Sequence, residues 1–344
     1  MFFNFIKRKI KKKIYSKRSG VIKGINKNLN FENQLKYYLH SFGKKNSHKK
    51  FYVIQRFLGG GMFSNLNYVI HHIKIALQLD CIPIIDMKNF PTKYNEKTKV
   101  KNTLNAWEYY FEPINKYKLE DVYKSKFVIV VDGKTRKKSE FDTFKISEKE
   151  NYQIFKKYIK IKKEIKIEVE KFIKKNFFNK KVLGVHFRGS DMKTQERHPF
   201  PASFKQITSF IDYEIKNNKY NKIFLVTEEL NYIEKLKSKY KDKICYNSSY
   251  RSNNPDIFKN HKRKNHRYLI GKENIIDMLL LSNTKTIICT NSHLTDASNF
   301  LKKSKIKMIQ IKNGYNSNNL LFAQFNWYFK NFLPEFLGGF KLKR

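Results

Sequence analysis

The side chains with the clearest chemical potential in this chain are His186, Arg188 and Asp191, which stand within one short segment. The apolar residues around His186 predict a strand covered on both faces, and Gly189 follows where the backbone must turn. Open parallel α/β sheets bind ligands at the carboxyl ends of their strands. A guanidinium at such an edge offers a planar fork of donors that suits a phosphate. We therefore expect an anionic, phosphorylated ligand at this segment.

The elements that must position this segment alternate between strands and helices. Strand patterns fall at residues 51–55, 82–86, 127–131, 182–187, 223–227, 286–290 and 308–311. Helical patterns fall at residues 64–79, 152–177, 204–215, 233–236, 273–282 and 296–301. This alternation predicts βαβ units, and a chain of 344 residues exceeds what one core usually supports. We expect two Rossmann-like halves joined near residue 180.

The net charge of +43 is typical of proteins that bind nucleic acids or anionic membranes. Only ten of the 72 basic residues are arginines, and the lysines are spread along the whole chain among many Asn, Ile, Tyr and Phe residues. This distribution favours compositional drift over a dedicated nucleic-acid module. We expect no nucleic-acid partner, and a basic nucleic-acid-binding protein is the alternative class.

The cysteines and the start of the chain bear on its location. Cys81, Cys245 and Cys289 stand far apart, so neither a disulfide framework nor a zinc site is indicated, and a cytoplasmic location is expected. Residues 1–6 lack the apolar length of a signal peptide or a membrane span. The aromatic start and the basic run at residues 7–13 suit either peripheral contact with an anionic membrane or a solvated terminus, and both interpretations stay open.

Three segments carry a family pattern. The first is His186-Phe-Arg188-Gly-Ser-Asp191 with Glu196 ten residues after the histidine, and the second is a strand ending in Thr227-Glu228-Glu229. In the third, Asp277 precedes Leu281-Ser282 and then Cys289-Thr290-Asn291-Ser292. Together they resemble the fucosyltransferases with an H-x-R-x-x-D signature, closest to the α-1,6-fucosyltransferases and their bacterial nodulation-factor relatives. The glycine-rich loop at Gly60 and Gly61, with Asn65, is similar to the family's N-terminal G-x-x-x-Q-L motif.

The resemblance implies an α/β, GT-B-like fold in which two Rossmann-like domains face a central cleft. We expect a basic segment over residues 1–50, an acceptor-side α/β domain over 51–178 and a nucleotide-sugar domain over 179–312. A helical tail over 313–344 is expected to pack back on the body through residues at helical spacing, which are Leu321, Phe325, Tyr328, Phe329 and Phe332.

The resemblance also implies roles for the matched residues. Arg188 would stabilise the diphosphate as the glycosidic bond breaks, and Glu196 would take the proton from the acceptor hydroxyl. Asp277 would accept from the N1–H and N2–H edge of guanine. The remaining donor-binding positions are Gly60, Gly61, Asn65, His186, Asp191, Thr227, Glu228, Thr290 and Ser292. No Asp-x-Asp pair occurs in the chain, so we expect no metal ligands, and no cofactor beyond the GDP-sugar donor.

Several patterns compete with these interpretations. The family's second arginine is Gly189 here, the second acidic position after Thr227 is glutamate, and the serine expected after Ser292 is His293. Gly133-Lys134-Thr135 mimics the end of a P-loop but lacks the required upstream glycine. The basic run at residues 259–267 is expected to be a mobile loop beside the nucleotide site.

We therefore expect an inverting, metal-independent glycosyltransferase that moves fucose from GDP-fucose to a hydroxyl of a cell-surface glycan. A transferase for another GDP-sugar is the alternative within the same class. Glu196 stands near Lys193, Arg197 and His198, where a solvated salt bridge is the ordinary outcome, so Glu228 or Glu229 is the alternative base.

Overall fold

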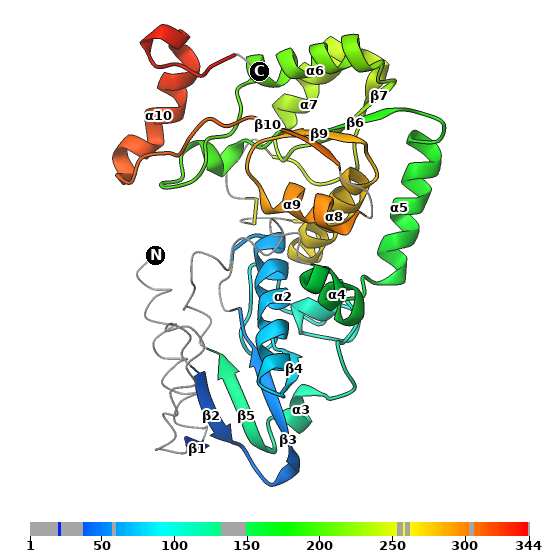
Figure 1. Cartoon of the computed structure of the whole chain (residues 1–344), viewed down its shortest axis with the longest axis vertical. Helices are drawn as coiled ribbons and strands as arrows, with labels where there is room; N and C mark the ends of the chain where they lie inside the picture. Colours follow the sequence, from blue (N-terminus) through cyan, green and yellow to red (C-terminus); the bar gives the residue numbers. More distant parts are fainter. Residues whose placement is uncertain are drawn as a thin grey trace. The chain divides into compact units, whose positions relative to one another are not determined.

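The computed structural model describes residues 20–21, 37–56, 60–131, 149–252, 257–258, 262–302 and 306–342. The chain divides into an N-terminal unit, Met1–Ile161, and a C-terminal unit, Lys162–Arg344. Each unit is built on its own five-stranded sheet, and the two sheets are shown in Figure 1. The expected α/β class with parallel sheets is confirmed.

The N-terminal unit contains a mixed sheet with the strand order β1-β2-β5-β3-β4. Strand β3 (Lys45–Ile54) runs parallel to β4 (Ile82–Ile85) and to β5 (Ser125–Val131). Helix α2 (Met62–Gln78) connects β3 to β4 and buries most of its residues. The short strands β1 (Gly20–Val21) and β2 (Tyr37–Ser41) are antiparallel additions that the sequence reading missed, so the first 50 residues contribute to this sheet.

The C-terminal unit contains a wholly parallel sheet with the strand order β10-β9-β6-β7-β8. Its strands are β6 (Val182–His186), β7 (Lys222–Val226), β8 (Ile244–Cys245), β9 (Thr286–Cys289) and β10 (Lys307–Gln310). The first strand, β6, lies in the middle, and the strand order reverses between β6 and β9. That reversal is the topological switch point at which doubly wound sheets bind ligands.

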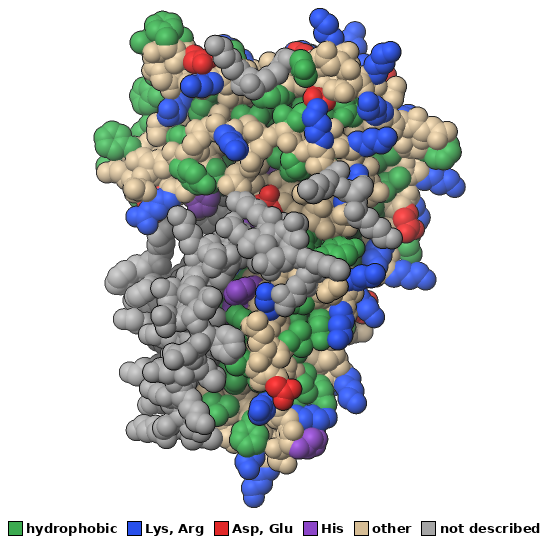
Figure 2. Space-filling model, in the orientation of Figure 1, with side chains coloured by type: hydrophobic (Ala, Val, Ile, Leu, Met, Phe, Trp, Pro, Cys, Tyr) green, Lys and Arg blue, Asp and Glu red, His purple; other side chains and the backbone are tan. Residues whose placement is uncertain are grey.

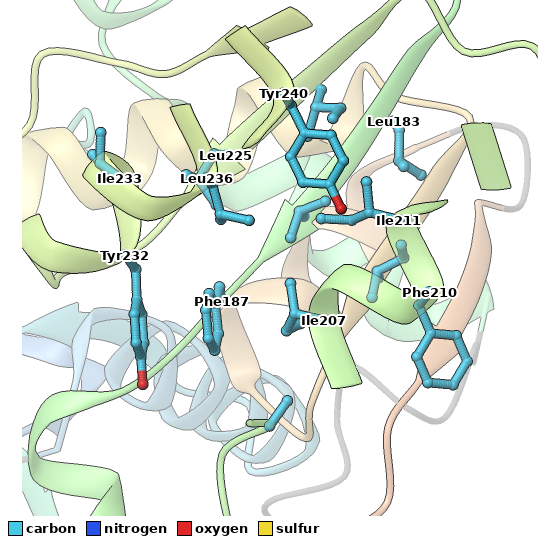
Figure 3. Packing of buried hydrophobic residues seen from close by; sticks show 14 of the residues in the cluster. Leu183, Phe187, Ile207, Phe210, Ile211, Leu225, Tyr232, Ile233, Leu236 and Tyr240 are labelled. Carbon is cyan, nitrogen blue, oxygen red and sulfur yellow. The ribbon is translucent and has the colours of Figure 1, made fainter. Parts of the chain in front are cut away.

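Helices cover both faces of this parallel sheet. Figure 1 shows α6 (Phe204–Asn218) and α7 (Leu230–Tyr240) on one face, and α5 (Lys163–Asn176), α8 (His266–Ser282) and α9 (His293–Leu301) on the other. The core under α6 and α7 is shown in Figure 3, where Phe187 stacks on Tyr232 with ring centroids 3.8 Å apart. Because Phe187 is completely buried, it fixes the chain immediately before Arg188.

The prediction of one long helix over residues 152–177 is wrong, because two helices occupy this range. Helix α4 (Lys149–Tyr158) ends before an extended stretch in which Ile161 forms a β-bridge with Phe111. Helix α5 then packs on the C-terminal sheet through Phe172, whose ring contacts that of Phe224. The division after Ile161 therefore lies upstream of the boundary at residue 178 that the sequence suggested.

The tail forms helix α10 (Leu320–Phe332) and a short 3-10 turn, η5 (Glu335–Leu337). The tail is helical and packs on the C-terminal unit, but the expectation that it does so through its helically spaced apolar residues is wrong. Ala323 and Trp327 form the buried face of α10 instead, and the residues expected to be buried are exposed, namely Leu321, Phe325, Tyr328, Phe329 and Phe332.

Candidate functional site

The carboxyl edge of the C-terminal sheet brings together most of the residues expected to bind the donor. In the parallel register, His186 pairs with Val226 of β7 and with Cys289 of β9, so the three strands end at the same level. Arg188, Glu228 and Thr290 follow these strands directly. The residues that the sequence pattern grouped by spacing therefore lie around the switch point between β6 and β9.

Arg188 lies on the open side of this edge. Its side chain is about one-third exposed, and its Nε lies 4.0 Å from Glu228 Oε1. The same Glu228 oxygen accepts a hydrogen bond of 3.2 Å from the Gly189 backbone N–H. The Glu228 carboxylate thus holds both the guanidinium and the turn after it, while the rest of the arginine fork stays accessible to a phosphate.

His186 ends β6 and is buried. Burial, together with the charge of Arg188, lowers the pKa of its imidazole to about 3. The ring is therefore neutral at physiological pH and cannot serve as a cation for the diphosphate. Its Nδ1 is buried and has no hydrogen-bond partner within the described part of the chain, so a ligand atom at this edge would satisfy it.

Gly189, which replaces the second arginine of the family signature, has a steric reason to be glycine. A Cβ at this position would lie 2.1 Å from Glu229 Oε1 and 2.9 Å from Tyr232 Cε2. The Glu229 carboxylate fills that space and forms a largely buried ion pair with Lys193 at 2.7 Å. Lys193 Nζ in turn lies 4.8 Å from the ring centroid of Tyr232. The Lys193–Glu229 ion pair therefore occupies the space that the Cβ of any other residue at position 189 would need.

Asp277 shares a face of the sheet with His186. Gly184 lies against α8, because a Cβ there would lie 2.9 Å from Leu281 Cδ2, and His186 points to the same face two residues later. Asp277 precedes Leu281 by four residues, or about one turn of the helix. Because α8 links two parallel strands, it runs back toward their amino ends, which puts Asp277 nearer the carboxyl edge than Leu281.

The Asp277 carboxyl group is buried and only half satisfied. Its Oδ2 accepts a hydrogen bond of 3.2 Å from Ser249 Oγ, whereas its buried Oδ1 has no partner among the residues that the structure describes. Desolvation raises the pKa of this carboxyl to about 7, against the opposing effects of the Arg251 charge and of the Ser249 and Asn247 side chains. An unpaired acceptor at this depth is what a buried donor of a ligand would complete.

Arg251 is a candidate site residue that the sequence reading missed. It follows the short strand β8, its Nη1 donates to the Ser249 carbonyl at 2.6 Å, and its guanidinium lies 4.9 Å from the Tyr246 ring centroid. The neighbouring Ser252 N–H donates to the Glu228 carbonyl at 3.0 Å, which connects this segment to the Arg188 turn. Recognition of β8 at Ile244–Cys245 is the signal that would have placed Arg251 at this edge.

Three expected ligand-binding hydroxyls occupy positions with local structural roles. Ser292 is the N-cap of α9, and its Oγ accepts from the Leu294 N–H at 3.3 Å. Thr227 Oγ1 accepts from the Glu229 N–H at 3.2 Å, and Thr290 is buried. The N-terminus of α9 nevertheless lies just after β9 at the switch point, where the N-terminal end of a helix suits an anion.

Glu196, the expected base, lies on the loop between η3 (Ser190–Lys193) and α6, and its side chain is partly exposed. The loop is held from outside, because the Arg197 N–H donates to the Ser317 carbonyl and the Asn316 N–H donates to the His198 carbonyl. Within the described part of the chain, no hydrogen bond or ion pair joins the Glu196 carboxylate to Arg188, so the catalytic role of Glu196 stays a prediction. Asp191 belongs to η3, and its side chain lies outside the described part of the structure.

Gly60, Gly61 and Asn65 belong to the N-terminal unit, where they follow β3 and begin α2. Gly61 is the N-cap of α2, and a Cβ on Gly60 would lie 3.2 Å from Ser64 Oγ. Asn65 is buried, and its Oδ1 has no partner among the described residues. Arg56, which was not predicted, is buried beside this turn with its guanidinium 4.5 Å from the Tyr68 ring centroid.

The N-terminal unit also contains a cavity of about 570 Å³ next to β4. Aromatic, amide and charged side chains line it, including Trp107, Tyr117, Asn102, Lys88 and Glu120. Its size lies within the range of small-ligand sites. This mixture of flat apolar rings and hydrogen-bonding groups is chemically suited to a sugar.

The basic run at residues 259–267 is anchored where the structure describes it. Arg263 donates to both carboxylate oxygens of Glu273, at 2.6 and 3.3 Å, and His266 contacts the Ile257 carbonyl at 2.7 Å. His266 and Arg267 begin helix α8, so the expectation of a loop is wrong for these two residues, and the mobility of the rest stays a prediction. Residues 1–19 and the P-loop-like Gly133-Lys134-Thr135 lie outside the described residues.

Searches with protein-family models and against curated proteins each found no match. Among solved structures, NodZ α-1,6-fucosyltransferase co-crystallised with GDP is 16% identical, covering 74% of this chain and 93% of its own, with a TM-score of 0.49. POFUT1 in complex with GDP-fucose is 10% identical, covering 77% of this chain and 99% of its own, with a TM-score of 0.44. A mutant of Arabidopsis thaliana FUT1 in complex with GDP is 11% identical, covering 74% and 69%, with a TM-score of 0.44.

Proposed function

We propose that this protein is a glycosyltransferase that uses a GDP-sugar, GDP-fucose in the first instance, and transfers the sugar to a glycan hydroxyl. The observation that carries the proposal is the convergence at one sheet edge of an open arginine and a buried, half-satisfied carboxyl group. Arg188 suits the diphosphate, and Asp277 suits two adjacent N–H donors of a base. Both residues stand in the motifs that resemble the fucosyltransferase signature.

In this proposal Arg188 acts on the leaving group. Two guanidinium N–H groups would bind the diphosphate oxygens, where negative charge grows as the glycosidic bond breaks, so the stabilisation is greatest in the transition state. His186, which burial keeps neutral, would contribute a hydrogen bond rather than a charge. The charge of Arg188 would take the place of a divalent cation, which makes the proposed reaction independent of added metal.

Glu196 is the proposed base. It would take the proton of the acceptor hydroxyl while that oxygen attacks the anomeric carbon on the face opposite the diphosphate, and inversion would follow. Of the alternatives, Glu229 is committed to Lys193 and Glu228 accepts from the Gly189 N–H. Glu196→Gln should keep GDP affinity and reduce transfer by roughly 100-fold. Transfer at the parental rate would move the role to Glu228.

Acceptor binding is assigned in this proposal to the N-terminal unit. The cavity beside β4 supports it, because its aromatic and amide lining fits a carbohydrate surface. Peripheral association with the inner face of a membrane, in the cytoplasm, would bring the protein to precursors of cell-surface glycans.

The direct test is a screen of nucleotide-sugar turnover by the purified chain. We expect GDP to be released from GDP-fucose, more slowly from GDP-mannose and not from UDP-sugars, with no loss of rate in EDTA. Turnover of UDP-sugars in preference to GDP-sugars would refute the proposal. For a basic nucleic-acid-binding protein, GDP would leave the melting temperature unchanged, whereas specific GDP binding would raise it.

A further inference from the structure

The surface of α10 is unusually apolar for a helix on the outside of a protein. Seven of its large apolar side chains are more than half exposed, and Phe332 is 87% exposed. Leu320 begins the helix, and the other six are called the α10 apolar face; they are Leu321, Phe322, Phe325, Tyr328, Phe329 and Phe332. Figure 2 shows the apolar side chains over α10 at the upper left. Apolar patches of this kind mark interaction surfaces.

The α10 apolar face lies opposite the side by which the helix is attached. Members recur at spacings of three, four and seven residues, which puts them on one side of a helix with 3.6 residues per turn. Ala323 and Trp327 occupy the other side and are buried. Trp327 Nε1 donates to the Pro201 carbonyl at 3.0 Å, and its ring lies 5.0 Å from Lys193 Nζ. The helix is therefore attached to the C-terminal unit through Ala323 and Trp327, and the α10 apolar face takes no part in this attachment.

The sequence from residue 297 onward, which includes α10, is rich in basic residues. Helix α10 contains no acidic residue, and Glu335 is the only one after Asp296, against nine basic residues in the same stretch. These are Lys302, Lys303, Lys305, Lys307, Lys312, Lys330, Lys341, Lys343 and Arg344. Lys330 lies on α10 itself, and Lys341 lies close to it, because the Phe340 N–H donates to the Lys330 carbonyl at 3.0 Å. Aromatic side chains in basic surroundings suit an anionic lipid surface.

We propose that the α10 apolar face docks on an anionic lipid bilayer, with the aromatic rings inserted at the level of the headgroups. Among the described residues, no helix combines the length and apolar character that a membrane span requires, so α10 lies in the interface rather than across it. The contact is a property of the C-terminal unit and does not depend on the proposed transfer reaction.

The contact also has a route to the candidate site. Trp327 packs against Lys193, the residue that pairs with Glu229 behind Gly189. Asn316, which precedes α10, donates from Nδ2 to the Ala323 carbonyl at 2.9 Å, and its backbone N–H holds the loop that carries Glu196. Docking through α10 would therefore hold the Arg188 turn and the Glu196 loop at a fixed distance from the lipid surface.

The test is co-sedimentation of the full chain with vesicles of phosphatidylcholine alone or mixed with phosphatidylglycerol. We expect binding to the anionic vesicles, weakened by salt, and a drop in the partition coefficient of at least about tenfold for Phe325→Ser/Phe329→Ser/Phe332→Ser. Phe178→Ser is the matched control, because Phe178 is 68% exposed but lies outside α10. It should bind like the parent.

Three results would overturn the proposal. The first is full vesicle binding by the triple variant, shown to be folded by its circular dichroism and GDP binding. The second is loss, on deletion of residues 1–19, of binding that the triple variant keeps, which would place the contact at the other end of the chain. The third is a dimer that the triple variant breaks while no vesicle binding occurs, which would make a second copy the partner.

Discussion

Two arginine–carboxylate pairs near the same edge of the C-terminal sheet differ in their access to water. Arg188 and Glu228 are partly exposed and lie 4.0 Å apart. Asp277 is buried and Arg251 is partly buried; they form no ion pair, but the charge of Arg251 opposes the rise in the pKa of Asp277, and Asp277 Oδ1 and two Arg251 guanidinium nitrogens have no partner among the described residues. Charges interact weakly in a solvated pair and strongly in a desolvated one.

This difference in solvent access indicates which kind of ligand group each site could bind. The open pair can exchange its partner for a phosphate at low cost, because little interaction energy is lost when Arg188 turns to a ligand. The second carboxyl group, Asp277, is desolvated, and its burial raises its pKa to about 7. A partly solvated arginine suits a ligand group whose negative charge grows during the reaction. A buried carboxyl group suits the recognition of N–H donors that have fixed positions on a ligand.

The largest effect is expected at the open pair. Arg188→Ala should reduce sugar transfer by about 100- to 1000-fold, because the guanidinium contributes mainly in the transition state. The variant should remain folded, since Phe187 rather than Arg188 fills the core. Steady-state kinetics with GDP-fucose measure the effect, and Arg188→Lys should recover little because an ammonium lacks the planar fork. Turnover near the parental rate would show that the open pair is not catalytic.

A smaller effect is expected from pH at the buried pair. Ionised Asp277 is the form that accepts two N–H donors, and its pKa is raised to about 7. GDP affinity should therefore fall about tenfold between pH 8 and pH 6. Asp277→Asn should bind GDP weakly with a flatter pH profile, which separates this carboxyl from the titration of the phosphates. Calorimetry across the range checks the prediction, and equal slopes for both proteins would contradict it.

The same raised pKa fixes the sign of a stability effect. The folded chain holds the Asp277 proton up to about pH 7, whereas the unfolded chain releases it near its ordinary value of about 3.9. Ionisation of Asp277 therefore favours unfolding. Its contribution to the free energy of unfolding falls as the pH rises from about 3.9 to about 7.

Much of the candidate site could be predicted from the sequence, because residues that directly follow neighbouring parallel strands lie together at the carboxyl edge of the sheet. The motifs around His186, Thr227 and Asp277 gave the correct edge and the helix that carries the acid. Arg251 was missed because β8 is only two residues long and gives no periodic signal. The Lys193–Glu229 pair behind Gly189 depends on side-chain contacts between distant segments, which spacing does not reveal.

The tail shows another limit of sequence patterns. Helical spacing of Leu321, Phe325 and Phe332 predicts an apolar face but is the same whether that face meets a core or the surroundings. Only the observed burial of Trp327 on the opposite side decides between them. Periodicity thus gave the helix correctly and its buried side wrongly.

A further effect concerns the stability of the turn beside the open pair, at Gly189. Gly189→Ala would place a Cβ 2.1 Å from Glu229 Oε1, and such overpacking typically costs about 1–3 kcal/mol. Chemical denaturation should show this loss, and it should shrink in a Glu229→Ala background, where the space is empty. A fully additive double variant would mean that Glu229 is not the reason for glycine at this position.

The most direct test of the central claim compares GDP with IDP, which lacks the guanine N2 amino group. If Asp277 accepts from both N1–H and N2–H, the parent should bind GDP at least about tenfold more tightly than IDP, the value of one hydrogen bond to a charged group. Isothermal calorimetry above pH 7, where Asp277 is ionised, measures both affinities. In Asp277→Ala the two nucleotides should bind equally and weakly. Equal binding of GDP and IDP by the parent, or an undiminished preference in Asp277→Ala, would contradict the account.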